Sequence, residues 1–153
     1  MSYRCGFTAW IAGWATSVFL PSLCIAFLGL SAPVALNGTG FSQLAGNSWQ
    51  VADDVGPAVK LMIGSLLLAG LFGLNRLLHG AAAARLLGGG IVGVAAMLAT
   101  ISFIPAGLSR GFALALAGER FDTILSLIYL LGGAIGGVTM ILVADRCTRQ
   151  GRP

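Results

Sequence analysis

The sequence predicts an all-α integral membrane protein, with four transmembrane helices in an antiparallel bundle and both termini cytoplasmic. Three observations support this prediction. Only 9% of the 153 residues are charged while 57% are hydrophobic, and the mean hydropathy is +0.91. Four apolar blocks approach or exceed the length that a bilayer requires. If each of the four blocks crosses the bilayer, most of the basic residues lie on the same side of it.

The composition excludes several classes of protein. A soluble domain carries about 25% charged residues, and one of this size buries only about two-thirds of its unfolded surface. It would have too little interior for this much apolar surface, whereas lipid removes that difficulty. The net charge is +4, but the basic residues flank apolar blocks and form no continuous stripe. Nucleic-acid binding is therefore not expected.

Four apolar blocks supply the predicted spans of a single transmembrane domain, residues 1–153. A helix crosses the hydrocarbon core in about 20 apolar residues. The blocks cover residues 7–30, 57–78, 86–104 and 124–144, and an outer loop spans residues 31–56. Pro57 is suited to a first helical turn, because its missing N–H would be unpaired there. Pro105 is expected to end or kink the third span, and Asp122 to cap the fourth.

Basic residues give the expected orientation. Six of the nine lie at the two termini or in the short second loop, namely Arg4, Arg76, Arg85, Arg146, Arg149 and Arg152. The opposite side holds Lys60, Arg110 and Arg120. By the positive-inside rule both termini are cytoplasmic. Richness in Gly, Ala and Leu favours a bacterial inner membrane. The alternative interpretation of the first span is a signal peptide that is cleaved from the mature protein.

Cysteine usage predicts no disulfide framework. Cys5, Cys24 and Cys147 are an odd number of cysteines, and their spacing is not that of a metal site. We interpret them as free, small hydrophobic side chains, in preference to redox or metal chemistry.

Small residues recur at four-residue spacing in all four spans, which predicts close helix packing. Lipid does not drive helices together, so their association depends on van der Waals contact and interhelical hydrogen bonds. The fourth span carries two adjacent GxxxG pairs. The predicted packing residues are Gly132, Gly133, Gly136, Gly137, Ser65, Ala69, Gly73, Gly89, Gly93, Ala9, Gly13 and Ser17. These faces either pack entirely within one bundle, which we favour, or leave one face for another subunit.

Chemistry at mid-membrane is not indicated. Asp, Glu, His, Lys and Arg are missing from the middle of the predicted spans, although proton relays and ion-coupled transport normally need such a group. His79 is a lone histidine at a span end, where a solvated side chain is the simpler interpretation than a haem or metal ligand. The segment "LLGGGIVG" lacks the strand and the Lys-Ser/Thr of a phosphate loop. We expect no catalytic residue, cofactor or metal.

The predicted function is therefore one of interaction. We expect a non-enzymatic accessory, assembly or regulatory subunit that contacts the lipid bilayer and either other membrane-protein subunits or further copies of itself. The alternative is a small homo-oligomeric channel or transporter for an uncharged or apolar solute, with its pathway at a subunit interface.

Overall fold

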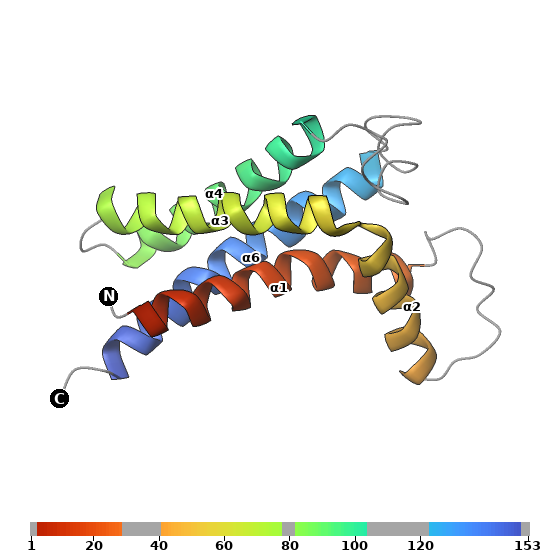
Figure 1. Ribbon diagram of the computed structural model, residues 1–153, viewed down its shortest axis with the longest axis horizontal. Coiled ribbons are helices and arrows are strands. Elements are labelled where there is room, and N and C mark those ends of the chain that lie inside the picture. The colour runs from red at the N-terminus through yellow and green to blue at the C-terminus, as the bar shows by residue number, and fades with distance from the viewer. Residues whose placement is uncertain (1–2, 29–40, 78–81, 104–122, 151–153) are drawn as a thin grey trace.

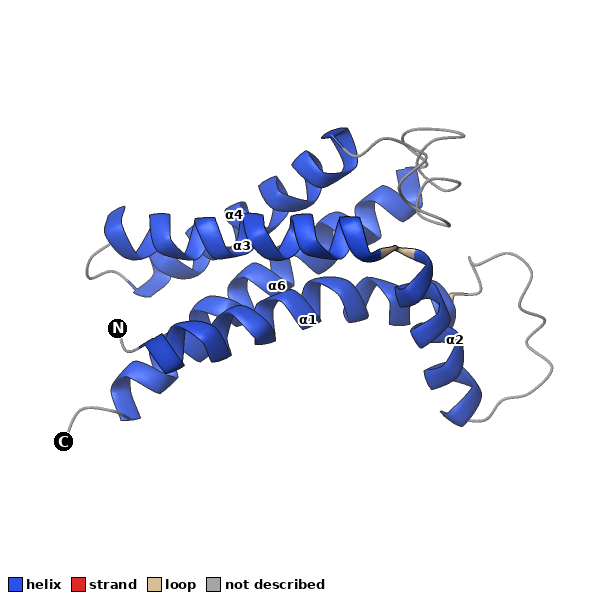
Figure 2. Cartoon of the chain, viewed as in Figure 1, coloured by secondary structure: helices blue, strands red, loops and turns tan. Residues whose placement is uncertain are grey.

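The computed structural model describes residues 3–28, 41–77, 82–103 and 123–150. Within these residues the chain is helical throughout apart from short turns, and no strand occurs (Figures 1 and 2). The helices are α1 (Tyr3–Phe27), α2 (Phe41–Asp54), α3 (Pro57–Leu77), α4 (Ala82–Phe103) and α6 (Thr123–Gln150). The all-helical prediction is thus confirmed for the described part of the chain.

Four of these helices are long and apolar enough to cross a membrane, as predicted: α1, α3, α4 and most of α6. The bounds of α3 nearly match its predicted span, whereas α1 and α4 begin before their spans and α6 continues past its own. α4 begins at Ala82 and α6 continues to Gln150, whereas the predicted spans began at residue 86 and ended at residue 144. An apolar block marks the length of helix suited to hydrocarbon, and polar residues such as Arg85 and Asp145 continue the helix beyond it.

α6 lies between α1 and α4 and packs along both of them, and α1 also packs on α2 and α3. Contacts between α1 and α6 run in opposite order along the two helices. Cys5 joins Cys147 near one end, Gly13 faces Met140, and Pro21 faces Gly132 toward the other. The beginning of α1 and the end of α6 lie at the same end of the molecule (Figure 1).

The interior holds large apolar side chains, and so does much of the outer surface. Leu67, Met97 and Met140 are fully buried. Leu61 and Ile91, by contrast, keep 72% and 69% of their surface exposed. Such outward apolar faces on every long helix would be costly in water and are the arrangement suited to lipid.

The helix α2 corrects the prediction of an outer loop over residues 31–56. Residues 41–54 are helical, and in Figure 1 this helix lies across the end of α1, away from the chain termini. Its buried residues Ser48 and Ala52 are one turn apart, and the largely exposed Trp49 stacks on Phe19 of α1 with the ring centroids 5.7 Å apart. The Gly, Asn and Ser content suggested a loop, but this helical spacing of buried residues outweighs propensity once α1 is available for packing.

A tight turn connects α2 to α3. Gly56 has a positive φ of 80°, which glycine adopts without steric penalty. The Gly56 N–H donates to the Asp53 carbonyl at 3.0 Å. Pro57 is the first residue of α3, as predicted. The carboxylate of Asp53 lies 3.8 Å from the Lys60 ammonium. The predicted roles of Pro105 and Asp122 fall outside the described residues.

Candidate functional site

The two glycine stripes of α6 face two different helices. Gly132 and Gly136 contact α1: a Cβ built on Gly136 would lie 2.7 Å from the Gly13 carbonyl oxygen, and one built on Gly132 would collide with the Pro21 ring. Real Cβ atoms do not approach other heavy atoms this closely, so any larger residue would force the helices apart. The α1–α6 interface therefore requires glycine at these positions.

Gly133 and Gly137 lie on the neighbouring stripe and contact α4. A Cβ built on Gly133 would lie 2.6 Å from the Gly93 carbonyl oxygen, and one on Gly93 would collide with the Gly133 carbonyl. Gly89 approaches Gly137 in the same way, with 2.7 Å between a built Cβ and the carbonyl oxygen. Here backbone meets backbone, so neither helix has a side chain that could move aside.

The packing residues of α1 are also inside the bundle. Ala9 is fully buried, and the Ser17 side chain is 1% exposed. The Ser17 hydroxyl donates to the Gly13 carbonyl of its own helix at 2.9 Å. A Cβ built on Gly13 would lie 2.7 Å from the Cβ of Met140. This face of α1 is therefore occupied by α6.

The small-residue stripe of α3 differs from the others because no described helix covers it. Ser65 and Ala69 are exposed, and a Cβ built on Gly73 would meet no atom within 4 Å. The Ser65 hydroxyl bonds to the Met62 carbonyl of its own helix at 3.0 Å. The buried face of α3 instead carries large residues, Leu67 and Leu71 among them. Of the predicted packing residues, these three alone lie on an open face within the described chain.

Two tryptophans on α1 form interhelical hydrogen bonds that the sequence did not suggest. The Trp10 indole N–H donates to the Gly64 carbonyl at 2.7 Å, and the Trp14 indole N–H donates to the Lys60 carbonyl at 2.8 Å. The two rings stack with their centroids 6.3 Å apart. Gly64 makes room for them, since a Cβ there would lie 3.2 Å from Trp14. The four-residue spacing of the two tryptophans was the available signal.

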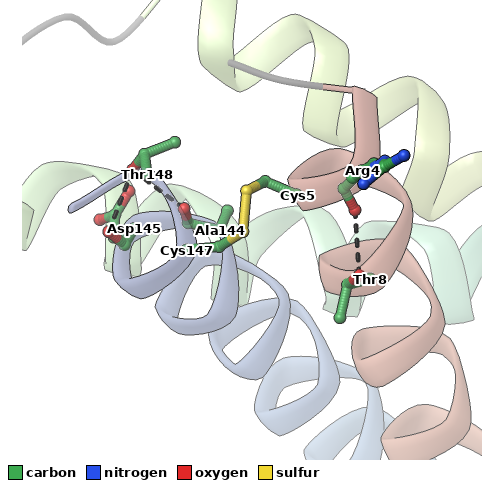
Figure 3. Close-up of a disulfide and its surroundings, with 7 residues drawn as sticks. All are labelled: Arg4, Cys5, Thr8, Ala144, Asp145, Cys147 and Thr148. Carbon is green, nitrogen blue, oxygen red and sulfur yellow. Dashed lines mark hydrogen bonds between the residues drawn. A yellow bond between two sulfur atoms is a disulfide. The ribbon is translucent and has the colours of Figure 1, made fainter. Parts of the chain in front are cut away.

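A disulfide between Cys5 and Cys147 corrects the expectation of free cysteines (Figure 3). Their Cα atoms are 5.6 Å apart, within the range that a disulfide spans. Both residues flank apolar blocks on the same predicted side, which was the signal that could have paired them. Cys24, at the other end of α1, is free as expected.

An ion pair near the disulfide joins α4 to α6. The Arg85 guanidinium lies 2.9 Å from the Asp145 carboxylate, and the two side chains are 23% and 21% exposed. Arg85 also donates to the Asn75 amide oxygen of α3 at 3.0 Å. Its Nε has no hydrogen-bond partner among the described residues. Three helices therefore meet at one polar cluster at this end of the bundle.

Two further buried hydroxyls of the described helices are bonded within their own helices. The buried hydroxyls of Ser22 and Thr100 bond to carbonyls one turn earlier in their own helices, at 2.8 and 2.7 Å. Among the described residues no group of three His, Cys, Asp or Glu side chains is placed to hold a metal ion. His79 lies outside the described residues. The "LLGGGIVG" segment is part of α4, where Gly89 and Gly93 pack closely against α6.

These features define a class by architecture: a chain whose described residues are all helical, with four helices long and apolar enough to cross a bilayer. Comparison with known proteins adds no closer relationship, because no protein-family model matches the chain and no curated protein or solved structure is significantly similar to it.

Proposed function

We propose that this chain is a four-span protein of a bacterial inner membrane that acts as a non-enzymatic accessory, assembly or regulatory subunit through helix packing. In this proposal the long helices form an antiparallel bundle with both termini in the cytoplasm. The charge distribution supports that orientation, since six of the nine basic residues lie at the terminal side.

The open stripe of α3 is the observation that carries the proposal. The glycine faces of α6, α4 and α1 are occupied within the bundle, so they hold this chain together. Among the described residues, no helix packs against the α3 stripe of Ser65, Ala69 and Gly73. A stripe of small residues four apart permits a second helix to approach backbone to backbone. Exposed Leu61 and Phe72 on the same helix supply larger apolar contacts beside the stripe.

Replacement of Ala69 by Leu tests this role. The side chain at Ala69 is exposed, so the variant should fold while its larger side chain blocks a partner helix. Affinity purification in mild detergent from the native host, with identification of co-eluting chains, should recover one partner in stoichiometric amount with the wild type. Recovery should fall about tenfold or more with Ala69→Leu, which corresponds to about 1.4 kcal/mol of lost association.

Ala95→Leu is the matched control, because Ala95 is an exposed alanine on α4, away from the stripe. It should leave partner recovery unchanged. Equal recovery with Ala69→Leu and with the wild type would contradict the proposal. So would reconstituted liposomes that become permeable to small uncharged solutes when the purified chain alone is inserted, since this result identifies a channel.

A further inference from the structure

A groove between α4 and α6 opens on the outer surface of the bundle, on a different face from the α3 stripe. Its volume is about 570 Å³, within the range of about 300–1,000 Å³ that is usual for ligand pockets. Every residue that lines it is apolar. They are Leu86, Leu87, Gly90, Ile91, Val94, Ala95, Leu98, Ala134 and Val138.

The small residues of the groove create its depth. A Cβ built on Gly90 would lie 3.5 Å from the Val138 side chain, an ordinary contact distance, so glycine at this position is not needed for α4 to approach α6. Ala134 is its small counterpart on α6. Leu87 and Ile91 stand on the rim with 70% and 69% of their surface exposed. The groove is thus an open apolar hollow, with a ridge of large α4 side chains along its rim and Ala134 and Val138 of α6 in its lining.

The length and position of the groove fit one leaflet. Its lining on α4 runs from Leu86 to Leu98, a rise of about 18 Å at 1.5 Å per residue. Half of a hydrocarbon core of about 30 Å is about 15 Å. The groove begins one residue after Arg85, whose pairing with Asp145 at 2.9 Å marks the polar end of the bundle. It therefore extends from that end to about mid-membrane.

An unpaired cation lies in line with the groove, beyond its polar end. Arg149 follows Val138 by eleven residues in α6, about three full turns, so both lie on the same side of the helix. It is exposed, and no carboxylate of the described chain forms a salt bridge with it. Arg149 is one turn past Asp145, or about 6 Å, which is the depth of the headgroup layer outside the hydrocarbon core. The neighbouring carboxylate of Asp145 is occupied by Arg85.

We infer that this groove binds one anionic phospholipid, with an acyl chain between α4 and α6 and the phosphate at Arg149. An apolar hollow one leaflet long selects an acyl chain, and the guanidinium selects a negatively charged headgroup. The inference rests on the proposed crossing of the bilayer and does not depend on the accessory role.

Native mass spectrometry of the purified full-length chain tests the site, with dioleoylphosphatidylglycerol and dioleoylphosphatidylcholine added at equal concentration. The wild type should retain one phosphatidylglycerol, about fivefold in preference to phosphatidylcholine, as expected for one arginine near an anionic headgroup. Arg149→Gln should abolish the preference while leaving phosphatidylcholine binding unchanged. Ala95→Leu, which fills the groove, should reduce retention of both lipids several-fold.

Two controls separate this site from general effects. Arg4→Gln removes an exposed arginine from α1, and Ala69→Leu enlarges an exposed alanine on α3; neither should change lipid retention. Lipid loss with Ala69→Leu, equal binding of the two lipids by the wild type, or an unchanged preference in Arg149→Gln would overturn the inference. A dimer that Ala95→Leu dissociates would also overturn it, because a second copy would then occupy the groove. Failure of partner capture would leave these measurements unaffected.

Discussion

Cys5 and Cys147 are 142 positions apart in the sequence and form a disulfide that joins the beginning of α1 to the end of α6. A crosslink between distant positions restricts the unfolded chain and stabilises a protein by about 2–4 kcal/mol. Cys147→Ser should therefore lower the Tm of the detergent-solubilised chain, and dithiothreitol should lower the wild-type Tm by the same amount. Cys24→Ser, the free-cysteine control, should respond to dithiothreitol like the wild type. An equal Tm for oxidised and reduced chain would contradict this prediction.

The redox state of this disulfide in cells follows from the proposed orientation. Disulfides are rare in the bacterial cytoplasm, where thiols are kept reduced. If the arginine-rich end is cytoplasmic, Cys5 and Cys147 should be thiols in growing cells and should form the disulfide after treatment with diamide. Acid quenching followed by a maleimide-polyethylene glycol gel shift measures the number of free thiols per chain. The Cys24→Ser variant is used so that only Cys5 and Cys147 contribute to that number. Complete oxidation in untreated cells would place both termini on the oxidising side instead.

The ion pair of Arg85 with Asp145 should contribute more to stability than a surface pair. Exposed pairs contribute about 0–1 kcal/mol, while removal of one partner of a buried pair costs about 3–5 kcal/mol. At roughly one-fifth exposure, we expect Asp145→Asn to cost about 2 kcal/mol, because the Arg85 guanidinium stays partly buried without its carboxylate. Urea or SDS unfolding measures this. Arg85→Met combined with Asp145→Leu should recover most of the loss, and no recovery would argue against an ionic origin.

Gly93 and Gly73 provide a matched pair for the packing of α4 on α6. A Cβ on Gly93 would collide with the Gly133 carbonyl, whereas one on Gly73 would meet nothing within 4 Å. Gly93→Ala should therefore destabilise the bundle by about 3 kcal/mol, at or above the usual range for overpacking. Gly73→Ala should stay within about 0.5 kcal/mol of the wild type. SDS-induced loss of helicity, followed by circular dichroism, measures the stability of both variants. Equal stability of Gly93→Ala and Gly73→Ala would contradict the prediction and show that α4 can move away from α6 at little cost.

The sequence predicted the long helices well because lipid imposes a simple length and polarity requirement on each one separately. It also indicated which residues are small enough for close contact. It could not assign those residues to partners, because four-residue spacing looks the same on a buried face, such as Gly133 and Gly137, as on an open one, such as Ala69 and Gly73. The sequence also could not predict the Cys5–Cys147 and Arg85–Asp145 pairs. They form only because particular helix ends lie side by side, and the packing of the whole bundle determines which ends do so.

The hydrogen bonds of Trp10 and Trp14 should each contribute separately to the stability of the contact between α1 and α3. Each indole N–H donates to a carbonyl of α3, at 2.7 and 2.8 Å, and interhelical hydrogen bonds in membrane proteins are worth about 0.6 kcal/mol on average. Trp14→Phe removes the donor and keeps an aromatic ring, so it should cost about 1 kcal/mol, including the lost contact area. The double variant with Trp10→Phe should cost about twice as much. Thermal unfolding in detergent measures both, with Phe27→Leu, at an exposed position on α1, as the control. If the double variant were as stable as the wild type, α3 would have to be held mainly by its apolar face, with Val59, Ile63 and Leu67 as the residues to truncate next.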